Sequence, residues 1–128
     1  MAENILVVDD DDAIRNMLDG FLKLCGYKVD SAEGVDTALK LIESNDYDIM
    51  LIGINMPGID GGSQGGIDLL RHVQSKSLSS GVLMMTGNPT VESTAEALKL
   101  GAFDYLHKPF SLGHLRLMIK RLLQNRNL

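Results

Sequence analysis

Residues 49–54 have the sequence IMLIGI, the most apolar run in the chain. An uninterrupted apolar run of this length predicts a central strand that is covered on both faces, as the strands of a parallel sheet are. Four further strands are expected over residues 5–8, 27–32, 82–86 and 103–106. The chain is therefore expected to fold around a sheet of short strands.

Amphipathic stretches lie between these runs. Apolar residues recur at helical spacing over residues 14–25, 35–42, 67–73, 91–98 and 115–122. Strict alternation of five strands with five helices predicts an α/β fold, in which a parallel sheet carries helices on both faces. Right-handed crossovers favour the flavodoxin-like, doubly wound strand order 2-1-3-4-5. The 128 residues show no repeat or linker, so a single domain over residues 1–128 is expected.

Three local signals predict helix ends. Gly26 follows the first helical stretch, where a left-handed C-cap is expected. Asn88 and Pro89 predict the start of the fourth helix, because asparagine caps helices and proline fits their first turn. Ser111 is the predicted cap of the last helix.

The composition limits the partners and the compartment. Twelve Lys and Arg residues face 17 Asp and Glu residues, a net charge of −5 that disfavours binding to nucleic acid or to an anionic membrane surface. No apolar run approaches the roughly 20 residues of a membrane span. The N-terminus lacks the pattern of a secretory signal, and the single cysteine, Cys25, fits a reducing compartment. A cytoplasmic protein is expected, without direct nucleic-acid or membrane partners.

Polar residues gather where strands of the expected sheet end. Asp9 to Asp12 follow the first strand, Thr86 ends the fourth, and Lys108 follows the fifth. Ligands bind at this edge of such sheets. Adjacent carboxylates repel one another unless a cation lies between them, and Mg²⁺ takes carboxylates, water and phosphate oxygens. A hydroxyl and an ammonium suit the other side of a phosphoryl group, whereas Asp11 and Asp12 have the alternative role of capping the first helix.

Four segments together resemble the response-regulator receiver domain of two-component signalling. They are ILVVDDDDAIR (residues 5–15), YDIMLIGINMPGIDG (47–61), LMMTG (83–87) and ALKLGAFDYLHKPF (97–110). The resemblance implies a non-enzymatic signalling domain. The partners it implies are a sensor histidine kinase or phosphotransfer protein, and an output domain or partner protein. It also implies a homodimer surface made by the fourth helix, the fifth strand and the fifth helix.

The resemblance further implies roles for single residues. Asp9 and Asp10 match the acidic pair that holds Mg²⁺, and the backbone carbonyl of Asn55 matches a third metal contact. Thr86 matches the switch hydroxyl, and Lys108 matches the phosphate-binding lysine. Tyr105 matches the aromatic residue that turns inward when the switch closes.

Gly53 departs from the family. It lies three residues before Met56-Pro57, where the resemblance implies the aspartate that accepts the phosphoryl group. Glycine has no side chain to accept that group, so no phosphoacceptor is expected at this position. Mg²⁺ loses a carboxylate ligand as well, and weakened metal binding is expected.

Other aspartates are the alternative acceptors. Asp48 lies five residues back along the strand, roughly 16 Å away, and Asp60 lies beyond a turn. Asp9 and Asp10 are near, and a carboxylate is a nucleophile, but accepting a phosphoryl group would end their metal role. We therefore expect no substitute acceptor.

The segment Gly61–Gly66 is an insertion relative to the family and is rich in glycine. It lacks the Lys-Ser/Thr pair of a nucleotide-binding loop, because Ile67 and Asp68 follow it. A tolerated surface insertion is the simpler interpretation, and a partner contact or a lid is the alternative.

The function predicted from the sequence is that of a receiver domain without its phosphoacceptor, acting as a phosphorylation-independent protein-interaction or switch module. Two alternatives stay open at this point. One is an ordinary phosphorylatable receiver in which glycine has replaced the aspartate at position 53. The other is a small flavodoxin-like protein that binds a nucleotide or another ligand.

Overall fold

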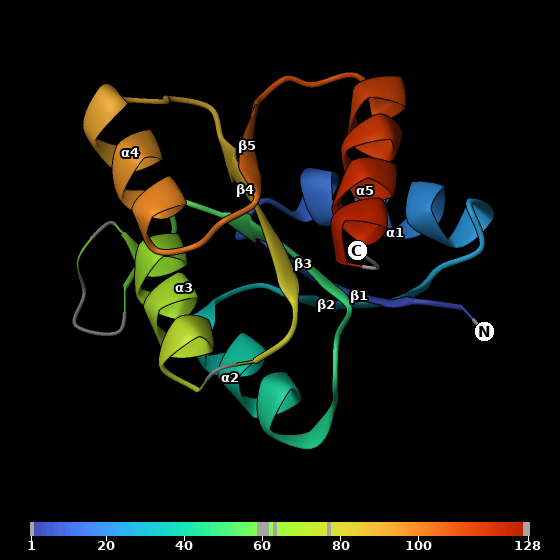
Figure 1. The fold of residues 1–128 in the computed structure, drawn as a ribbon, viewed down its shortest axis with the longest axis horizontal. Coiled ribbons are helices and arrows are strands. Elements are labelled where there is room, and N and C mark those ends of the chain that lie inside the picture. The colour runs from blue at the N-terminus through green and yellow to red at the C-terminus, as the bar shows by residue number, and fades with distance from the viewer. Residues whose placement is uncertain (1, 59–61, 63, 77, 127–128) are drawn as a thin grey trace.

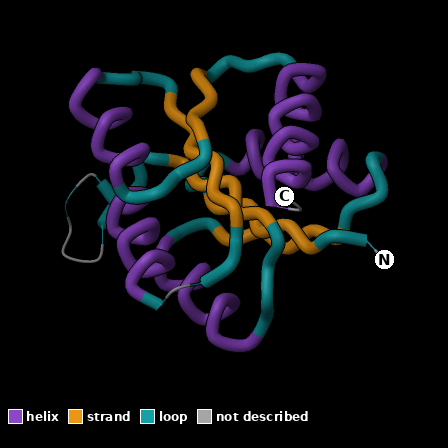
Figure 2. Tube along the Cα trace, in the orientation of Figure 1, coloured by secondary structure: helices purple, strands orange, loops and turns teal. Residues whose placement is uncertain are grey.

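The computed structural model describes residues 2–58, 62, 64–76 and 78–126. They form a five-stranded parallel sheet in the order β2-β1-β3-β4-β5, with helices on both faces (Figures 1 and 2). The strands are β1 (Asn4–Val8), β2 (Lys28–Ala32), β3 (Ile49–Gly53), β4 (Gly81–Thr86) and β5 (Asp104–His107). The helices are α1 (Asp12–Leu24), α2 (Val35–Ser44), α3 (Gly65–Ser75), α4 (Val91–Lys99) and α5 (Leu112–Arg126). The predicted fold class and strand order are confirmed.

Alternate residues of the central strands pack against opposite helix layers. Ile5 and Val7 of β1 join the core under α1 and α5, whereas Leu6 and Val8 join the core under α2, α3 and α4. Figure 1 shows these two groups of helices on opposite sides of the sheet. Every residue of β3 is buried, as the apolar run predicts. The two cores hold the central strands from both sides.

The strand register brings the ends of β1, β3 and β4 together. Val8, the last residue of β1, pairs with Ile52. Gly53, the last residue of β3, pairs with Met85 of β4. Because the strands are parallel, the loops that follow them leave from one side of the sheet, which we call the carboxyl edge.

Two of the predicted helix ends are confirmed. Gly26 has a φ of +96°, the left-handed conformation expected after α1. The Ser111 hydroxyl accepts a hydrogen bond from the amide of His114 at 3.0 Å, in the first turn of α5. Asp11 also takes the predicted capping role, since its carboxylate accepts the amide of Ala13 at 2.9 Å.

The predicted start of the fourth helix at Asn88-Pro89 is wrong. Thr90 is the N-cap of α4, because its hydroxyl accepts the amide of Ser93 at 3.0 Å. The Ser93 hydroxyl in turn accepts the Thr90 amide, and this reciprocal pair satisfies two amides that would otherwise lack partners.

Candidate functional site

The carboxyl edge contains a cavity of about 60 Å³ that gathers most of the residues predicted from the sequence. It is lined by Asp9, Asp10, Gly53, Asn55, Met56, Met85, Thr86, Gly87 and Lys108. These residues come from the segment after β1, from β3 and β4 and the segments that follow them, and from the residue after β5. The parallel topology thus assembles one site from four separate parts of the sequence.

Asp9 is the buried carboxylate of this site, with only 1% of its surface exposed. Its Oδ2 lies 2.6 Å from Lys108 Nζ, and its Oδ1 accepts the amide of Asp11 at 3.0 Å. Arg15 Nη1 donates to the backbone carbonyl of Asp9 at 2.7 Å. Burial of a charge is costly unless the charge is paired and hydrogen-bonded, and Asp9 meets both conditions.

The Asp9 carboxylate lies beside the empty side-chain position of Gly53. A Cβ atom added to Gly53 would be 2.8 Å from Asp9 Oδ2 and 3.2 Å from Asp9 Cγ. The space that a side chain at position 53 would enter is therefore partly taken by Asp9. An aspartate at this position would require the Asp9 side chain to shift.

Thr86 is buried, with 1% exposure, and both bonding directions of its hydroxyl are used. Thr86 Oγ1 donates to Asn55 Oδ1 at 3.0 Å and accepts the amide of Asn88 at 3.1 Å. The sequence interpretation included only the backbone carbonyl of Asn55 and missed its side chain. The signal that was available is a polar amide two residues beyond the end of a buried strand.

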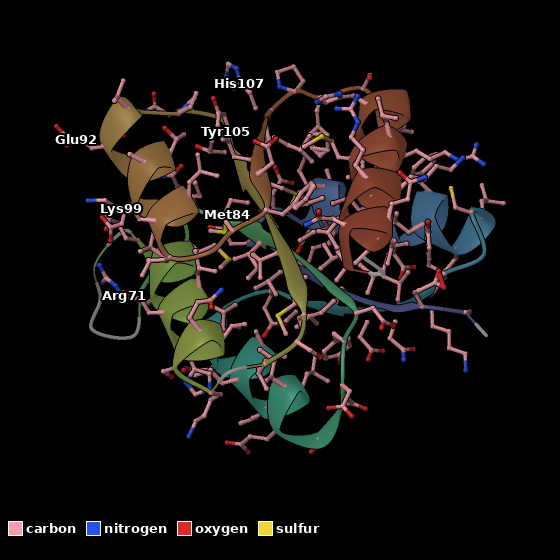
Figure 3. The ribbon with its side chains drawn as sticks, viewed as in Figure 1. Arg71, Met84, Glu92, Lys99, Tyr105 and His107 are labelled. Atoms are coloured by element: carbon pink, nitrogen blue, oxygen red, sulfur yellow. The ribbon has the colours of Figure 1, made fainter. Side chains whose placement is uncertain are left out.

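Tyr105 lies outside the group of residues that lines the cavity. Its side chain lies on β5 and is 37% exposed. Figure 3 shows Tyr105 and His107 in the region between α4 and α5. The structure therefore holds the predicted aromatic residue in an outward position.

The donors at the carboxyl edge fit Mg²⁺ poorly as they stand. Asp10 is exposed and offers a carboxylate, but both oxygens of Asp9 already have partners. Within the described part of the chain, no group of three or more His, Cys, Asp or Glu side chains is placed to hold a metal ion. A cation would have to compete with the Lys108 ammonium for Asp9.

Asp48 lies at the far end of β3 from the site. Asp48 Oδ2 accepts the amide of Asn4 at 2.8 Å, next to the first residue of β3 and at the opposite end of that strand from Gly53. Asp60 lies outside the described residues, as do Gly61 and Ser63 of the predicted insertion.

The end of the insertion belongs to α3. Gly65 donates its amide to the carbonyl of Met56 at 2.8 Å, and Gly66 donates to the carbonyl of Ile54 at 3.1 Å. A Cβ atom on Gly66 would overlap the carbonyl oxygen of Gly53. The first turn of α3 thus packs backbone to backbone on the segment that carries the site, which requires residues without side chains.

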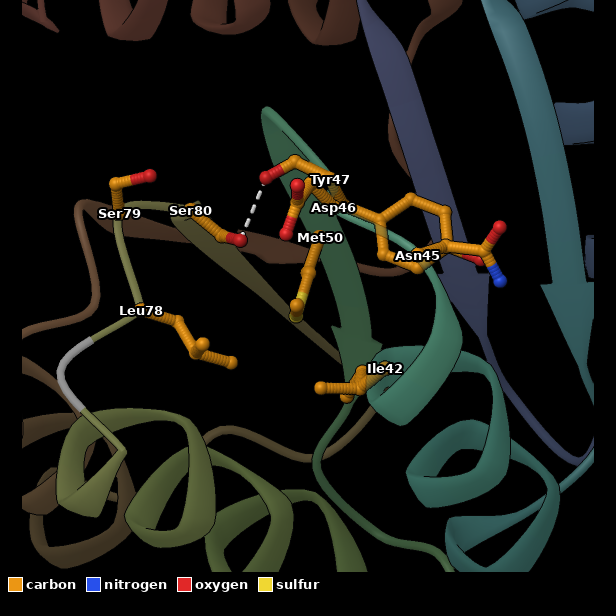
Figure 4. Close-up of a pocket in the computed structure, with 8 residues that line it drawn as sticks. All are labelled: Ile42, Asn45, Asp46, Tyr47, Met50, Leu78, Ser79 and Ser80. Atoms are coloured by element: carbon orange, nitrogen blue, oxygen red, sulfur yellow. Dashed lines mark hydrogen bonds between the residues drawn. The ribbon is translucent and has the colours of Figure 1, made fainter.

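A second, larger hollow lies at the opposite edge of the sheet, beside the starts of β3 and β4 (Figure 4). Its volume is about 250 Å³, and its apolar lining residues are Ile42, Met50 and Leu78. The Ser80 hydroxyl donates to the carbonyl of Tyr47 at 2.6 Å across this region. None of the site residues predicted from the sequence lines this hollow.

Among the helices that the structure describes, none combines the length and the apolar character that crossing a bilayer requires.

Comparisons with known proteins give consistent results. Residues 5–120 match the family model of the response regulator receiver domain. The chain is 40% identical over 120 residues to the regulatory protein AtoC of Escherichia coli (strain K12). This match covers 94% of the chain and 25% of AtoC. The chain is 36% identical over 124 residues to the response regulator MprA of Mycobacterium sp. (strain KMS), and this match covers 97% of the chain and 52% of MprA. It therefore spans about half or less of these curated relatives.

A solved structure resembles the whole chain. It is the crystal structure of a CheY-like response regulator receiver domain protein from Methanospirillum hungatei JF-1. The TM-score is 0.91 at 28% sequence identity, with 99% of this chain and 98% of that chain covered.

Proposed function

The chain belongs to the response regulator receiver domain family, and from this membership we propose that it works as a receiver that needs no phosphorylation. It is a receiver domain of a two-component response regulator. In the proposed role, it acts as a protein-interaction or switch module whose site keeps one arrangement. The module has no catalytic activity of its own.

The observation that carries the proposal is the state of the Gly53 position. No side chain at 53 faces the cavity, and the nearest carboxylate, Asp9, is buried and paired with Lys108 at 2.6 Å. Each Asp9 oxygen has a partner, the Asp11 amide for Oδ1 and the Lys108 ammonium for Oδ2, and these contacts stabilise the carboxylate and make it a weaker nucleophile. The cavity of about 60 Å³ also argues against a nucleotide or flavin binder, because pockets for such ligands measure roughly 300–1,000 Å³.

The proposed partners follow from the family and from the exposed apolar surface. A sensor histidine kinase or phosphotransfer protein docks without transferring a group, and an output domain or a separate partner protein receives the signal. Val91 and Leu98 of α4, Tyr105 of β5 and Leu117 of α5 are exposed by 37–85%. These exposed apolar side chains support a homodimer through α4, β5 and α5. The proposed compartment is the cytoplasm.

Mg²⁺ binding is proposed to be weak. The residues that would hold the ion are Asp9, Asp10 and the backbone carbonyl of Asn55. When bound, the ion would supply positive charge between the two carboxylates. Lys108 supplies part of that charge in the structure, because its ammonium already contacts Asp9.

Intact mass spectrometry after incubation with acetyl phosphate and Mg²⁺ tests the proposal. We expect the native chain to keep its mass, because position 53 carries no carboxylate and the Asp9 carboxylate is paired with Lys108. The matched variant is Gly53→Asp, which should gain one labile phosphoryl group once Asp9 has moved aside. A phosphoryl adduct on the native chain, mapped to Asp9 or to any other residue, would show that the site is not silent.

The native gene at codon 53 separates the proposal from the alternative of a replaced aspartate. A glycine codon supports a receiver that has lost its acceptor. An aspartate codon would return the protein to the ordinary phosphorylatable class.

A further inference from the structure

We infer that the side-chain oxygen of Asn55 takes the place of a phosphoryl oxygen as the hydrogen-bond acceptor for Thr86. The chain then holds the Thr86 hydroxyl at the site permanently, with one of its own side chains. This inference rests on the proposed function, in which no phosphoryl group is attached at position 53.

The geometry at Thr86 supports this substitution. Its hydroxyl is buried and donates to Asn55 Oδ1 at 3.0 Å. A buried hydroxyl without an acceptor costs free energy, so a receiver without a phosphoryl group needs another acceptor at this place. Asn55 provides one from the loop directly after β3. Asn55 is itself exposed, and its side-chain oxygen reaches the buried Thr86 hydroxyl from outside.

The same hydroxyl links two loops. Thr86 Oγ1 accepts the amide of Asn88, which lies in the loop that leads into α4. The chain of hydrogen bonds from Asn55 through Thr86 to Asn88 therefore ties the loop after β3 to the loop after β4. A backbone bond from the Ile54 amide to the Met85 carbonyl, 2.8 Å long, runs alongside it.

The cationic group of the site, the Lys108 ammonium, is also paired with a side chain of the protein itself. Lys108 Nζ contacts Asp9 Oδ2, which joins the segment after β5 to the end of β1. Two side-chain pairs thus close the carboxyl edge, one across β1 and β5 and one across β3 and β4. With both pairs formed, the position of Thr86 does not depend on a group added to the chain.

Nuclear magnetic resonance of the full chain, without any phosphodonor, tests the role of Asn55. The variant Asn55→Leu keeps the approximate shape of the side chain and removes the acceptor. The matched control is Asn16→Leu, the same change at an exposed position of α1. The measurements are the Thr86 χ1 populations, from three-bond couplings to its methyl group, and the hydrogen-exchange rate of the Asn88 amide.

We expect the native chain and Asn16→Leu to show one Thr86 rotamer and a protected Asn88 amide. In Asn55→Leu, the Thr86 rotamers should average, and Asn88 should exchange about three- to tenfold faster, the range expected for loss of one hydrogen bond. A single rotamer and unchanged exchange in Asn55→Leu would overturn the inference.

A second pair of variants gives the same test from the other side of the bond. Thr86→Ser keeps the hydroxyl and should keep Asn88 protected, whereas Thr86→Val removes the hydroxyl and should release it. Equal protection in both would also overturn the inference. Phosphorylation of the native chain by acetyl phosphate would contradict the proposed function alone, because the resonance measurements are made without a phosphodonor.

Discussion

The ion pair between Asp9 and Lys108 determines the charge at the site on the scale of single residues. Asp9 is 1% exposed, and the Lys108 side chain is 23% exposed. Removing one partner of a buried ion pair leaves an uncompensated charge, which is far more costly than losing an exposed pair. Lys108 is therefore both a stabilising residue and a competitor of any cation that approaches Asp9.

The variant Lys108→Met should lower the free energy of unfolding by about 2–3 kcal/mol without Mg²⁺, because Asp9 stays buried and unpaired. Added Mg²⁺ should restore part of this loss, since Asp9 Oδ2 becomes available to the ion. Urea denaturation with and without MgCl₂ measures both effects. Lys99→Met, at an exposed residue of α4, is the control. An equal response of the two variants to Mg²⁺ would contradict the competition.

On the scale of elements, the start of α3 is fixed to the site by backbone contacts. The amides of Gly65 and Gly66 donate to carbonyls of the segment after β3, so two amides of the first helical turn find partners outside the helix. This close approach leaves no room for a side chain at Gly66. The helix and the site loop are thereby one packed unit.

Gly66→Ala should destabilise the protein by about 1–3 kcal/mol, because the added methyl group overlaps the carbonyl of Gly53 and the backbone must shift. Gly20→Ala is the opposite case: Gly20 lies inside α1, with no atom within 4 Å of an added Cβ. That change should stabilise the protein by about 0.5–1 kcal/mol, the usual gain of alanine over glycine in a helix. Thermal denaturation of both variants checks the two signs, and a stabilised Gly66→Ala variant would rule out the close packing.

On the scale of the whole molecule, Tyr47 ties the edge strand β2 to the start of β3. Tyr47 is 5% exposed, and its hydroxyl donates to Asp30 Oδ2 at 2.7 Å. Burial, followed by the hydrogen bond and the charge of Asp30, raises the pKa of Tyr47 far above its usual value of 10.0. The folded state therefore keeps this hydroxyl protonated where the unfolded state loses the proton.

The contribution of Tyr47 to the free energy of unfolding should therefore be constant below pH 10. It should fall as the pH rises above 10. The loss is at most about 1.4 kcal/mol per pH unit for one proton. Tyr47→Phe should reduce the loss of stability above pH 10. A smaller loss should remain in this variant, because burial also raises the pKa of Tyr27. Urea denaturation between pH 9 and 11 measures the slope, with Tyr105→Phe as the exposed control. Equal slopes in the two variants would exclude this role of Tyr47.

The sheet order, the layers and most of the site were predictable from the sequence because their signals are local. A run such as IMLIGI must be buried wherever it lies, and alternating strands and helices leave few topologies. Asp9, Thr86 and Lys108 were identified because parallel strands bring their ends to one edge. The outward position of Tyr105 is a side-chain conformation, which no sequence pattern specifies.

The order of residues along the chain was enough to predict which groups reach the carboxyl edge and that Gly53 brings no carboxylate there. The pairing of the remaining groups became visible in the folded chain: Lys108 pairs with Asp9, 99 positions apart, and Thr86 with the Asn55 side chain, 31 positions apart. The folded chain also shows that Gly65 and Gly66 belong to a helix packed on the site loop. Burial can be predicted from local patterns of apolar residues, whereas hydrogen-bond partners depend on distances of a few ångströms between segments that meet only after folding.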